Sequence, residues 1–199
     1  MRHVPSADTR DLNADFEKDL AAALLPQEGY DVRKWLFVPP SYEEYRFILG
    51  TRGQKPLICV GVNPSTAAPD RLDRTLQSVE RIAKHNGFDS FLMFNVSAQR
   101  ATDPNLMDAE LDEHLHQENM KAFDYLLSLS DQPVVWAAWG AVIEKRPYLS
   151  ACVQDLFHIG QQHHAVWVCC GPLSKRGHPH HPLYLKSDSP LAPFEWKNT

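Results

Sequence analysis

Four short apolar runs recur along the chain between residues 55 and 170, and each is followed by a polar or glycine-containing loop. Their apolar positions are mostly consecutive, and they are rich in β-branched and aromatic side chains. Such runs are typical of strands that are buried on both faces of a parallel sheet. The predicted strands are 57–62, 91–94, 134–139 and 165–169.

The segments between these runs have the periodicity of amphipathic helices. Leu72, Leu76, Val79 and Ala83 fall on one helix face, and Gly87 follows as a C-terminal cap. Further helices are expected after the capping sequence at 102–104, around 120–127 and over 147–157. Strands that alternate with helices predict an α/β fold, here a three-layer sandwich around a central four-stranded, mainly parallel sheet.

The 199-residue chain is expected to form one core domain with additions at both ends. Residues 1–54 are interpreted as an N-terminal decoration, with a helix from Asp11 to Leu25 and an edge strand around 45–49. Residues 55–188 form the predicted α/β core domain, and residues 189–199 form a C-terminal tail.

Polar residues gather where the predicted strands end. Ligands of open parallel sheets bind outside the carboxyl ends of the strands, so these residues are expected to surround one site. The candidates along the chain are Asn63, Ser65, Thr66, Asp73, Asn95, Arg100, Trp139, Gly140, Lys175, His178, His180, His181 and Tyr184. Capping of the following helix is the alternative interpretation of Ser65 and Thr66.

The loop from Gly177 to Tyr184 is the least ordinary of these segments. It places His178, His180 and His181 among prolines, whose rings fix the backbone. Prolines and imidazoles together suit no common structural device, so a functional role is expected for this loop. A metal site that uses His178 and His180 with Asp103 or Asp73 is one alternative. No established metal-ligand spacing appears, so neither a metal nor a cofactor is expected.

Composition limits the classes of partner. A net charge of −5 argues against an extensive surface for duplex DNA. No apolar run approaches the roughly 18–20 residues that cross a bilayer, and no apolar signal core follows Met1, so a cytoplasmic protein without a membrane partner is expected. The four cysteines lack C-x₂-C spacing and are expected to be reduced core thiols.

Six motifs in order give the chain a resemblance to an uncharacterised bacterial family, domain-of-unknown-function family 1643. The matching sequences are NPSTA at 63–67, DRT at 73–75, Asn95, RATDP at 100–104, AWGA at 138–141 and GHPHHPLYL at 177–185. The resemblance covers about two-thirds of the chain, from Lys55 to Leu185. The family brings no established activity.

The layout more distantly resembles the uracil-DNA glycosylase superfamily. GVNPST at 61–66 is similar to that superfamily's first signature loop, and HPHHPL at 178–183 to its second. The resemblance implies that Asn63 orients the attacking water, that His178 or His181 steadies the departing base, and that Asn95 reads a base edge. Ser65 replaces the aromatic residue that stacks beside uracil, so a different base is expected.

Two main hypotheses follow for the function. The first is a glycosylase-like hydrolase that cleaves an N-glycosidic bond in a modified base, nucleoside or nucleotide. Asn63, His178 and His181 are its candidate catalytic residues, and the other strand-end residues bind the substrate. The second is a module that binds a nucleotide or nucleic-acid end without catalysis, through Ser65, Arg100 and Lys175. A metal-dependent hydrolase built on the histidine loop is the third and least favoured hypothesis.

Overall fold

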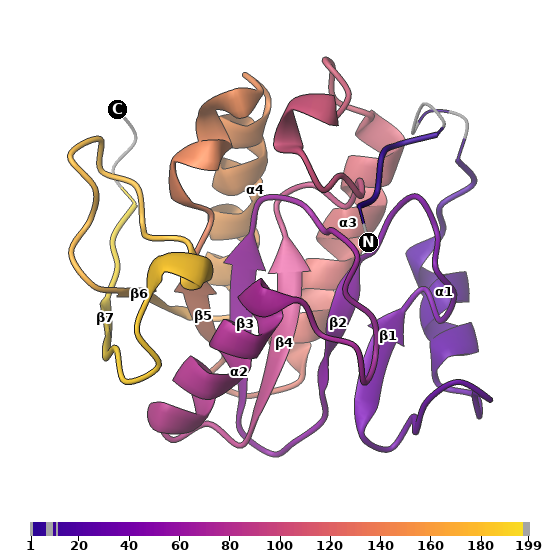
Figure 1. Ribbon diagram of the computed structural model, residues 1–199, viewed down its shortest axis with the longest axis horizontal. Helices are drawn as coiled ribbons and strands as arrows, with labels where there is room; N and C mark the ends of the chain where they lie inside the picture. Colours follow the sequence, from indigo (N-terminus) through magenta and orange to yellow (C-terminus); the bar gives the residue numbers. More distant parts are fainter. Residues whose placement is uncertain (1, 7–9, 11, 197–199) are drawn as a thin grey trace.

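A seven-stranded mixed sheet forms the centre of the protein (Figure 1). The computed structural model describes residues 2–6, 10 and 12–196. The strands are β1 (Trp35–Val38), β2 (Ile48–Thr51), β3 (Pro56–Gly61), β4 (Ser90–Asn95), β5 (Val134–Ala137), β6 (Val166–Cys170) and β7 (Leu191–Pro193). Their order across the sheet is β1-β2-β4-β3-β5-β6-β7.

The four central strands, β4, β3, β5 and β6, run parallel to one another. They correspond to the four apolar runs of the sequence, with ends that differ by one or two residues, and the predicted α/β class is confirmed. The sheet is larger and more mixed than predicted, because β1, β2 and β7 extend it with antiparallel pairings. The four parallel strands are thus the central part of a seven-stranded mixed sheet.

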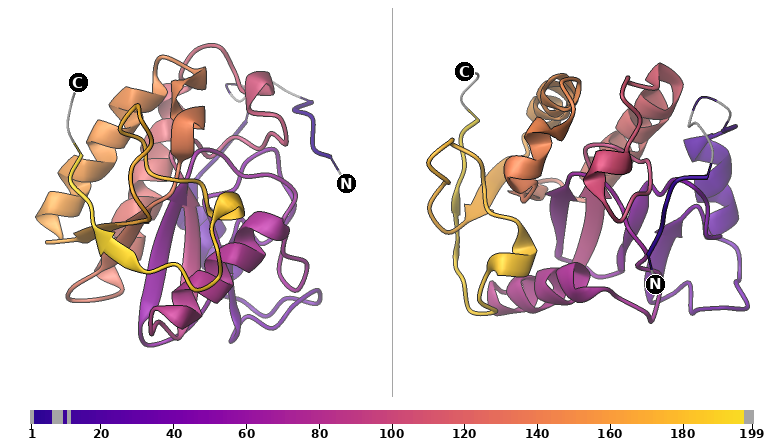
Figure 2. Two further views of the ribbon diagram at one scale, coloured as in Figure 1. Left: turned by 60° about the vertical axis from the view of Figure 1, so that its left-hand side comes forward. Right: turned by 45° about the horizontal axis from the view of Figure 1, so that its top comes forward.

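Helices cover both faces of the sheet (Figure 2). On one face lies α2 (Arg74–His85), and on the other lie α1 (Phe16–Ala23), α3 (Glu113–Ser128) and α4 (Leu149–Gln162). Single 3₁₀ segments connect the remaining elements: η2 (Pro104–Leu106), η3 (Gly140–Lys145) and η4 (Pro182–Tyr184). The expected helix after residue 104 is only this short η2, in which the Asp103 side chain accepts the N–H of Asn105 at 3.0 Å.

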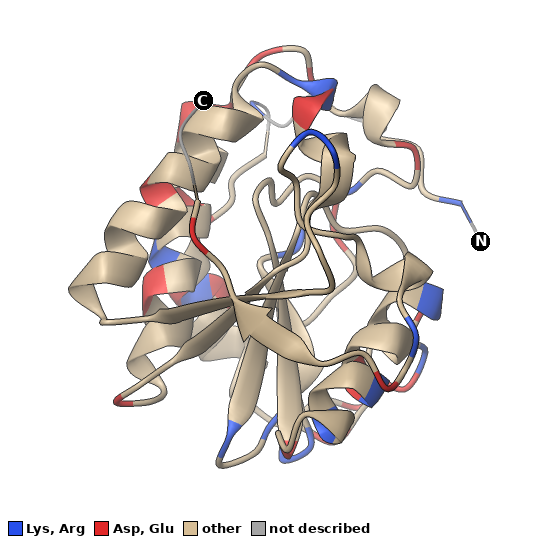
Figure 3. Ribbon diagram, turned by 90° about the vertical axis from the view of Figure 1, so that its left-hand side faces the viewer, with Lys and Arg blue, Asp and Glu red and all other residues tan. Residues whose placement is uncertain are grey.

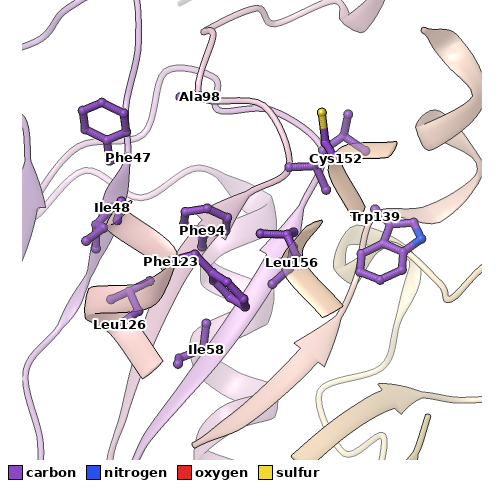
Figure 4. Packing of buried hydrophobic residues seen from close by; sticks show 14 of the residues in the cluster. Phe47, Ile48, Ile58, Phe94, Ala98, Phe123, Leu126, Trp139, Cys152 and Leu156 are labelled. Atoms are coloured by element: carbon purple, nitrogen blue, oxygen red, sulfur yellow. The ribbon is translucent and has the colours of Figure 1, made fainter. Parts of the chain in front are cut away.

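The sheet separates two hydrophobic cores. Leu57 and Cys59 of β3 belong to the core under α2, whereas Ile58 and Val60 belong to the core under α1, α3 and α4. This division follows from the alternation of side chains along a strand. Each such aliphatic residue contributes about 1.5–3 kcal/mol when it is fully buried, which is why these runs carry almost no polar side chain. Figure 4 shows the larger core, including Phe94, Phe123 and Trp139.

The four cysteines lie inside these cores with free thiols, as expected. Burial raises the pKa of Cys59, Cys152, Cys169 and Cys170. A protonated thiol is a poor nucleophile and a poor metal ligand, so these residues belong to the packing of the fold.

The two ends of the chain are more integrated than expected. The helix in the N-terminal segment is shorter than Asp11–Leu25, since the side chain of Asp15 caps α1 by accepting the N–H of Lys18 at 3.0 Å. The expected tail contributes β7, and Phe194 behind it is only 6% exposed. Residues 1, 7–9, 11 and 197–199 of these segments lie outside the described residues.

The charged residues of the surface are mixed in sign. Lys and Arg positions are interspersed with Asp and Glu positions in the view of Figure 3. Within the described residues, no helix is both long enough and apolar enough to cross a bilayer.

Candidate functional site

The carboxyl ends of β3 and β5 mark a switch point in the topology. The chain leaves β3 toward α2 on one face, and it leaves the neighbouring β5 toward η3 and α4 on the other face. Connections that diverge in this way open a crevice at the edge of the sheet. A cavity of about 720 Å³ lies here, and the loops after β3, β4, β5 and β6 all line it.

Nine of the predicted site residues meet in this cavity, although their positions span more than a hundred residues. The left view of Figure 2 shows η4 beside α2, which explains how the two ends of that span come together. The predicted residues in the lining are Asn63, Ser65, Thr66, Asp73, Asn95, Gly140, His180, His181 and Tyr184.

Asn63 is held in the first loop by its amide nitrogen. Nδ2 donates to the carbonyl oxygen of Ala101 at 2.7 Å and to that of Pro64 at 3.2 Å. Oδ1 has no hydrogen bond to the described part of the chain. Asn63 therefore brings a fixed, unused acceptor to the cavity, which can orient a water molecule but cannot take its proton.

Asn95 ends β4 and is only 1% exposed. Its Nδ2 has no hydrogen-bond partner among the described residues, although it is fully buried. Leaving a buried donor unpaired costs about 1–3 kcal/mol, so such a group in a cavity is well suited to pairing with a ligand. The absence of a Cβ at Gly61 leaves room for the Asn95 side chain, because a Cβ there would lie 2.9 Å from Asn95 Oδ1.

His181 and Asp73 interact electrostatically within the cavity. Burial lowers the pKa of His181, and the carboxylate of Asp73 opposes that effect. His181 Nδ1 accepts the N–H of Leu183 over a long 3.4 Å, which favours the neutral ring with its proton on Nε2. Asp73 Oδ1 caps α2 by accepting the N–H of Leu76 at 2.9 Å, while Oδ2 makes no hydrogen bond within the described residues.

Gly140 allows the loop after β5 to approach the histidine loop closely. Its φ of +62° lies in the left-handed region that favours glycine. A Cβ at this position would lie 3.3 Å from the Cβ of His181. Glycine is therefore favoured here both by the backbone conformation and by the close approach of His181.

Two predicted residues of the last loop lie outside the cavity lining. His178 Nε2 lies 2.6 Å from Oε1 of Glu144 in η3, and Arg176 Nη1 lies 2.6 Å from Oε2 of the same carboxylate. The imidazole of His178 thus binds Glu144 and does not line the cavity. Lys175 is exposed beside these residues.

Trp139 and Arg100 are also absent from the lining, because both are buried behind it. Trp139, labelled in Figure 4, is 0% exposed and belongs to the larger core. Its ring packs edge-to-face against those of Phe157 and Phe194. Arg100 stacks its guanidinium on the ring of Tyr42 at 4.2 Å, and its Nη1 donates to the carbonyl oxygen of Ser65. Arg100 therefore supports the loop after β3 without lining the cavity.

The structure adds residues that the sequence interpretation missed. Arg46 is 1% exposed and lines the cavity, together with Arg74 and Thr75 at the start of α2 and Thr102 after β4. A signal for Arg46 was present, since it is the charged residue within the apolar run 45–49. Thr102 Oγ1 lies 3.0 Å from Ser65 Oγ, which links the loops after β3 and β4.

The suggested metal ligands do not come together. Among the residues that the structure describes, no three His, Cys, Asp or Glu side chains are grouped in a way that could hold a metal ion. His178 is paired with Glu144, and Asp103 caps η2.

The fold and the cavity define a doubly wound α/β protein whose polar site lies at the switch point of its sheet. The chain belongs to the family described as "Protein of unknown function (DUF1643)", which matches residues 46–183. This span contains every lining residue except Tyr184. No curated protein and no solved structure matches the chain. The predicted family is confirmed, and the resemblance to uracil-DNA glycosylases stays a prediction.

Proposed function

We propose that the cavity binds a nucleobase compound and hydrolyses its N-glycosidic bond, in a fold distantly related to the uracil-DNA glycosylase superfamily. The observation that carries this proposal is the meeting of Asn63, Asn95 and His181 in one cavity of about 720 Å³. A volume of this size is within the usual range for small-ligand sites.

Base recognition falls to Asn95. A carboxamide presents one donor and one acceptor in a plane, which matches the edge of a nucleobase. Its unpaired Nδ2 is available for a base oxygen or ring nitrogen, and the burial of the side chain strengthens such a hydrogen bond.

Water activation is assigned to Asn63 and Asp73. Oδ1 of Asn63 accepts a hydrogen bond from the water, and the carboxylate of Asp73 takes one water proton. The water oxygen then forms a bond to the anomeric carbon, while the carbon–nitrogen bond breaks and its electron pair goes to the base. Asp73 suits this role because it is the one carboxylate in the lining formed by the described residues.

His181 stabilises the departing base. A neutral imidazole with its proton on Nε2 donates a hydrogen bond to the base as negative charge develops there. Burial, which lowers the pKa of His181, keeps the ring neutral at pH 7. The base then takes up a proton from solvent, and Asp73 releases its proton to solvent.

A panel of modified nucleosides, nucleotides and oligonucleotides tests the proposal, with base release measured by chromatography. Base release by the wild type is expected to fall strongly in Asn63→Ala and Asp73→Asn, since asparagine still caps a helix but cannot take a proton. His178→Ala is the matched control outside the cavity. The proposal fails if no substrate releases a base, or if these two cavity variants match the wild type.

A second candidate function is binding of a nucleotide or nucleic-acid end without catalysis. The observation that favours it is the pairing of His178 with Glu144, which leaves the cavity with fewer imidazoles than the sequence predicts. Thermal stabilisation by a nucleotide with no base release over long incubation would select this function.

A further inference from the structure

Two arginines are buried beside the loop that follows β3, and in the described part of the chain neither has a carboxylate close enough to form an ion pair. Arg46 Nη1 donates to the carbonyl oxygen of Ala67 at 3.2 Å, and Arg100 Nη1 donates to that of Ser65. Within the described residues, neither guanidinium has a carboxylate within 4.0 Å. Nε of Arg46 and both Nε and Nη2 of Arg100 are buried without a hydrogen-bond partner.

Arg46 carries the larger electrostatic penalty. Burial, reinforced by the charge of Arg100, lowers the pKa of Arg46 to about 9, so the group still bears its charge at pH 7. Burial also lowers the pKa of Arg100, to about 10, and the carboxylates of Glu43 and Glu44 partly offset this effect. The carboxylate of Asp73 partly offsets the effect of burial on Arg46. A buried charge without a close partner is expensive, and Arg46 is the one of the two that lines the cavity.

The first turn of α2 presents further donors to the same cavity. The N–H groups of the first turn of a helix have no partner within the helix, and the N-terminus carries partial positive charge. Asp73 satisfies the N–H of Leu76, and Gln77 N–H donates to the carbonyl oxygen of Asp73. The N–H groups of Arg74 and Thr75 remain, and both residues line the cavity.

We propose that Arg46 and the first turn of α2 form a subsite for a phosphate monoester, so that the ligand of the cleft is a nucleoside 5′-phosphate and not a nucleoside. This inference rests on the proposed function for the base-bearing part of the ligand. A phosphate has several acceptor oxygens, and a guanidinium, two N–H groups and the hydroxyls of Ser65, Thr66 and Thr75 supply several donors. The negative charge of Asp73 would repel the phosphate, whereas the positive charge of Arg74, which also lines the cavity, would attract it.

Binding to the full chain tests this subsite without any need for turnover. Isothermal titration compares a nucleoside 5′-monophosphate with its nucleoside, and inorganic phosphate and ribose 5-phosphate serve as probes without a base. We expect the monophosphate to bind at least about tenfold more tightly than the nucleoside, and inorganic phosphate to compete with it. Equal affinity for nucleoside and monophosphate, or no competition by inorganic phosphate, overturns the subsite.

Arg46→Gln should remove most of the preference for the monophosphate, whereas Arg33→Gln should keep it. Arg33 is the matched control, because it is exposed and paired with Asp31 at 2.9 Å. If Arg46→Gln keeps the preference for the monophosphate and only lowers Tm, Arg46 supports the loop and has no role in the subsite.

Arg74→Pro tests the helix N-terminus and remains informative if Arg46→Gln does not fold. Proline is favoured at the first helical position, and Asp73 before it is already extended, with φ −75° and ψ 175°. Arg74→Pro removes an N–H and a side-chain charge, whereas Arg74→Ala removes only the charge. Weaker binding of inorganic phosphate by Arg74→Pro than by Arg74→Ala supports the subsite, and equal binding contradicts it.

These results also separate the subsite from the proposed function. If the preference for phosphate is present but no base is released from any substrate, the hydrolase proposal fails and the subsite stands. If base is released from nucleosides and nucleotides at equal rates and with equal affinity, the hydrolase stands and the subsite fails.

Discussion

His178 contacts Glu144 through a 2.6 Å hydrogen bond between Nε2 and Oε1, and this contact turns one imidazole of the last loop away from the cavity. The same hydrogen bond lowers the pKa of Glu144 below its usual value, and the positive charge of Arg176 adds a smaller effect in the same direction. The carboxylate therefore joins η3 to the histidine loop from outside, while His181 of the same loop faces Gly140 and the cavity.

The first prediction contrasts these two histidines. His181→Ala is expected to lower base release, or ligand affinity, by at least tenfold, because it removes a donor from the cavity. His178→Ala should change it by less than about threefold, because His178 lies outside the cavity lining. Steady-state kinetics, or titration calorimetry if no turnover occurs, measure both variants. A larger loss in His178→Ala than in His181→Ala would contradict the arrangement.

The second prediction concerns pH. Burial lowers the pKa of His181 in the folded protein, whereas the unfolded chain protonates this ring near its ordinary value of 6.5. The unfolded state then binds more protons, so the free energy of unfolding should decline as the pH falls below about 6.5. Chemical denaturation of the wild type and of His181→Gln between pH 5 and 8 measures the difference. Parallel pH profiles for the two proteins would contradict a buried, neutral His181.

The third prediction concerns the space over Gly61. Gly61→Ala places a Cβ within 2.6 Å of Met93 Cε and 2.9 Å of Asn95 Oδ1, so Asn95 must move and ligand affinity should fall by at least tenfold. Gly29→Ala is the matched control, because nothing lies within 4 Å of a Cβ there. Ligand titration of both variants tests this, and unchanged affinity in Gly61→Ala would exclude Asn95 as a ligand contact.

The fourth prediction separates stability from binding. Trp139→Ala removes a fully buried ring outside the cavity lining and should lower the free energy of unfolding by about 3–5 kcal/mol. Tyr184→Ala removes a lining side chain that is 81% exposed, so it should weaken the binding of the ligand and leave Tm nearly unchanged. Denaturant melts and titrations well below Tm measure the two effects. The reverse pattern would place Trp139 at the ligand.

Much of the fold could be predicted from local pattern. The parallel strands β3, β4 and β5 are almost entirely buried, so runs such as 57–62 and 134–139 are nearly continuously apolar and stand out in the sequence. The antiparallel edge strands were harder to recognise. β7 has three residues, and two of them are exposed, so its sequence carries no clear pattern, and only its pairing with β6 defines it.

The candidate site could be predicted at the level of loops but not of single side chains. Asn63 follows the end of β3 by two residues and Asn95 ends β4, so topology alone brings them to one edge. Orientation within the loop at 178–184 depends on a carboxylate 34 positions away, and no local pattern indicates that His178 binds Glu144. Trp139 shows the same limit, since a residue at the end of a strand can face the core or the ligand.

The late position of η4 has a consequence for how the protein is made. A chain truncated after Cys170 would contain all four parallel strands, but it would lack both imidazoles of the cavity and its outer wall. Ligand affinity would therefore arise only when the last segment of the chain has docked against α2. During synthesis, the sheet of the incomplete chain would therefore be stabilised by its own packing alone. Ligand binding could stabilise only the full-length protein.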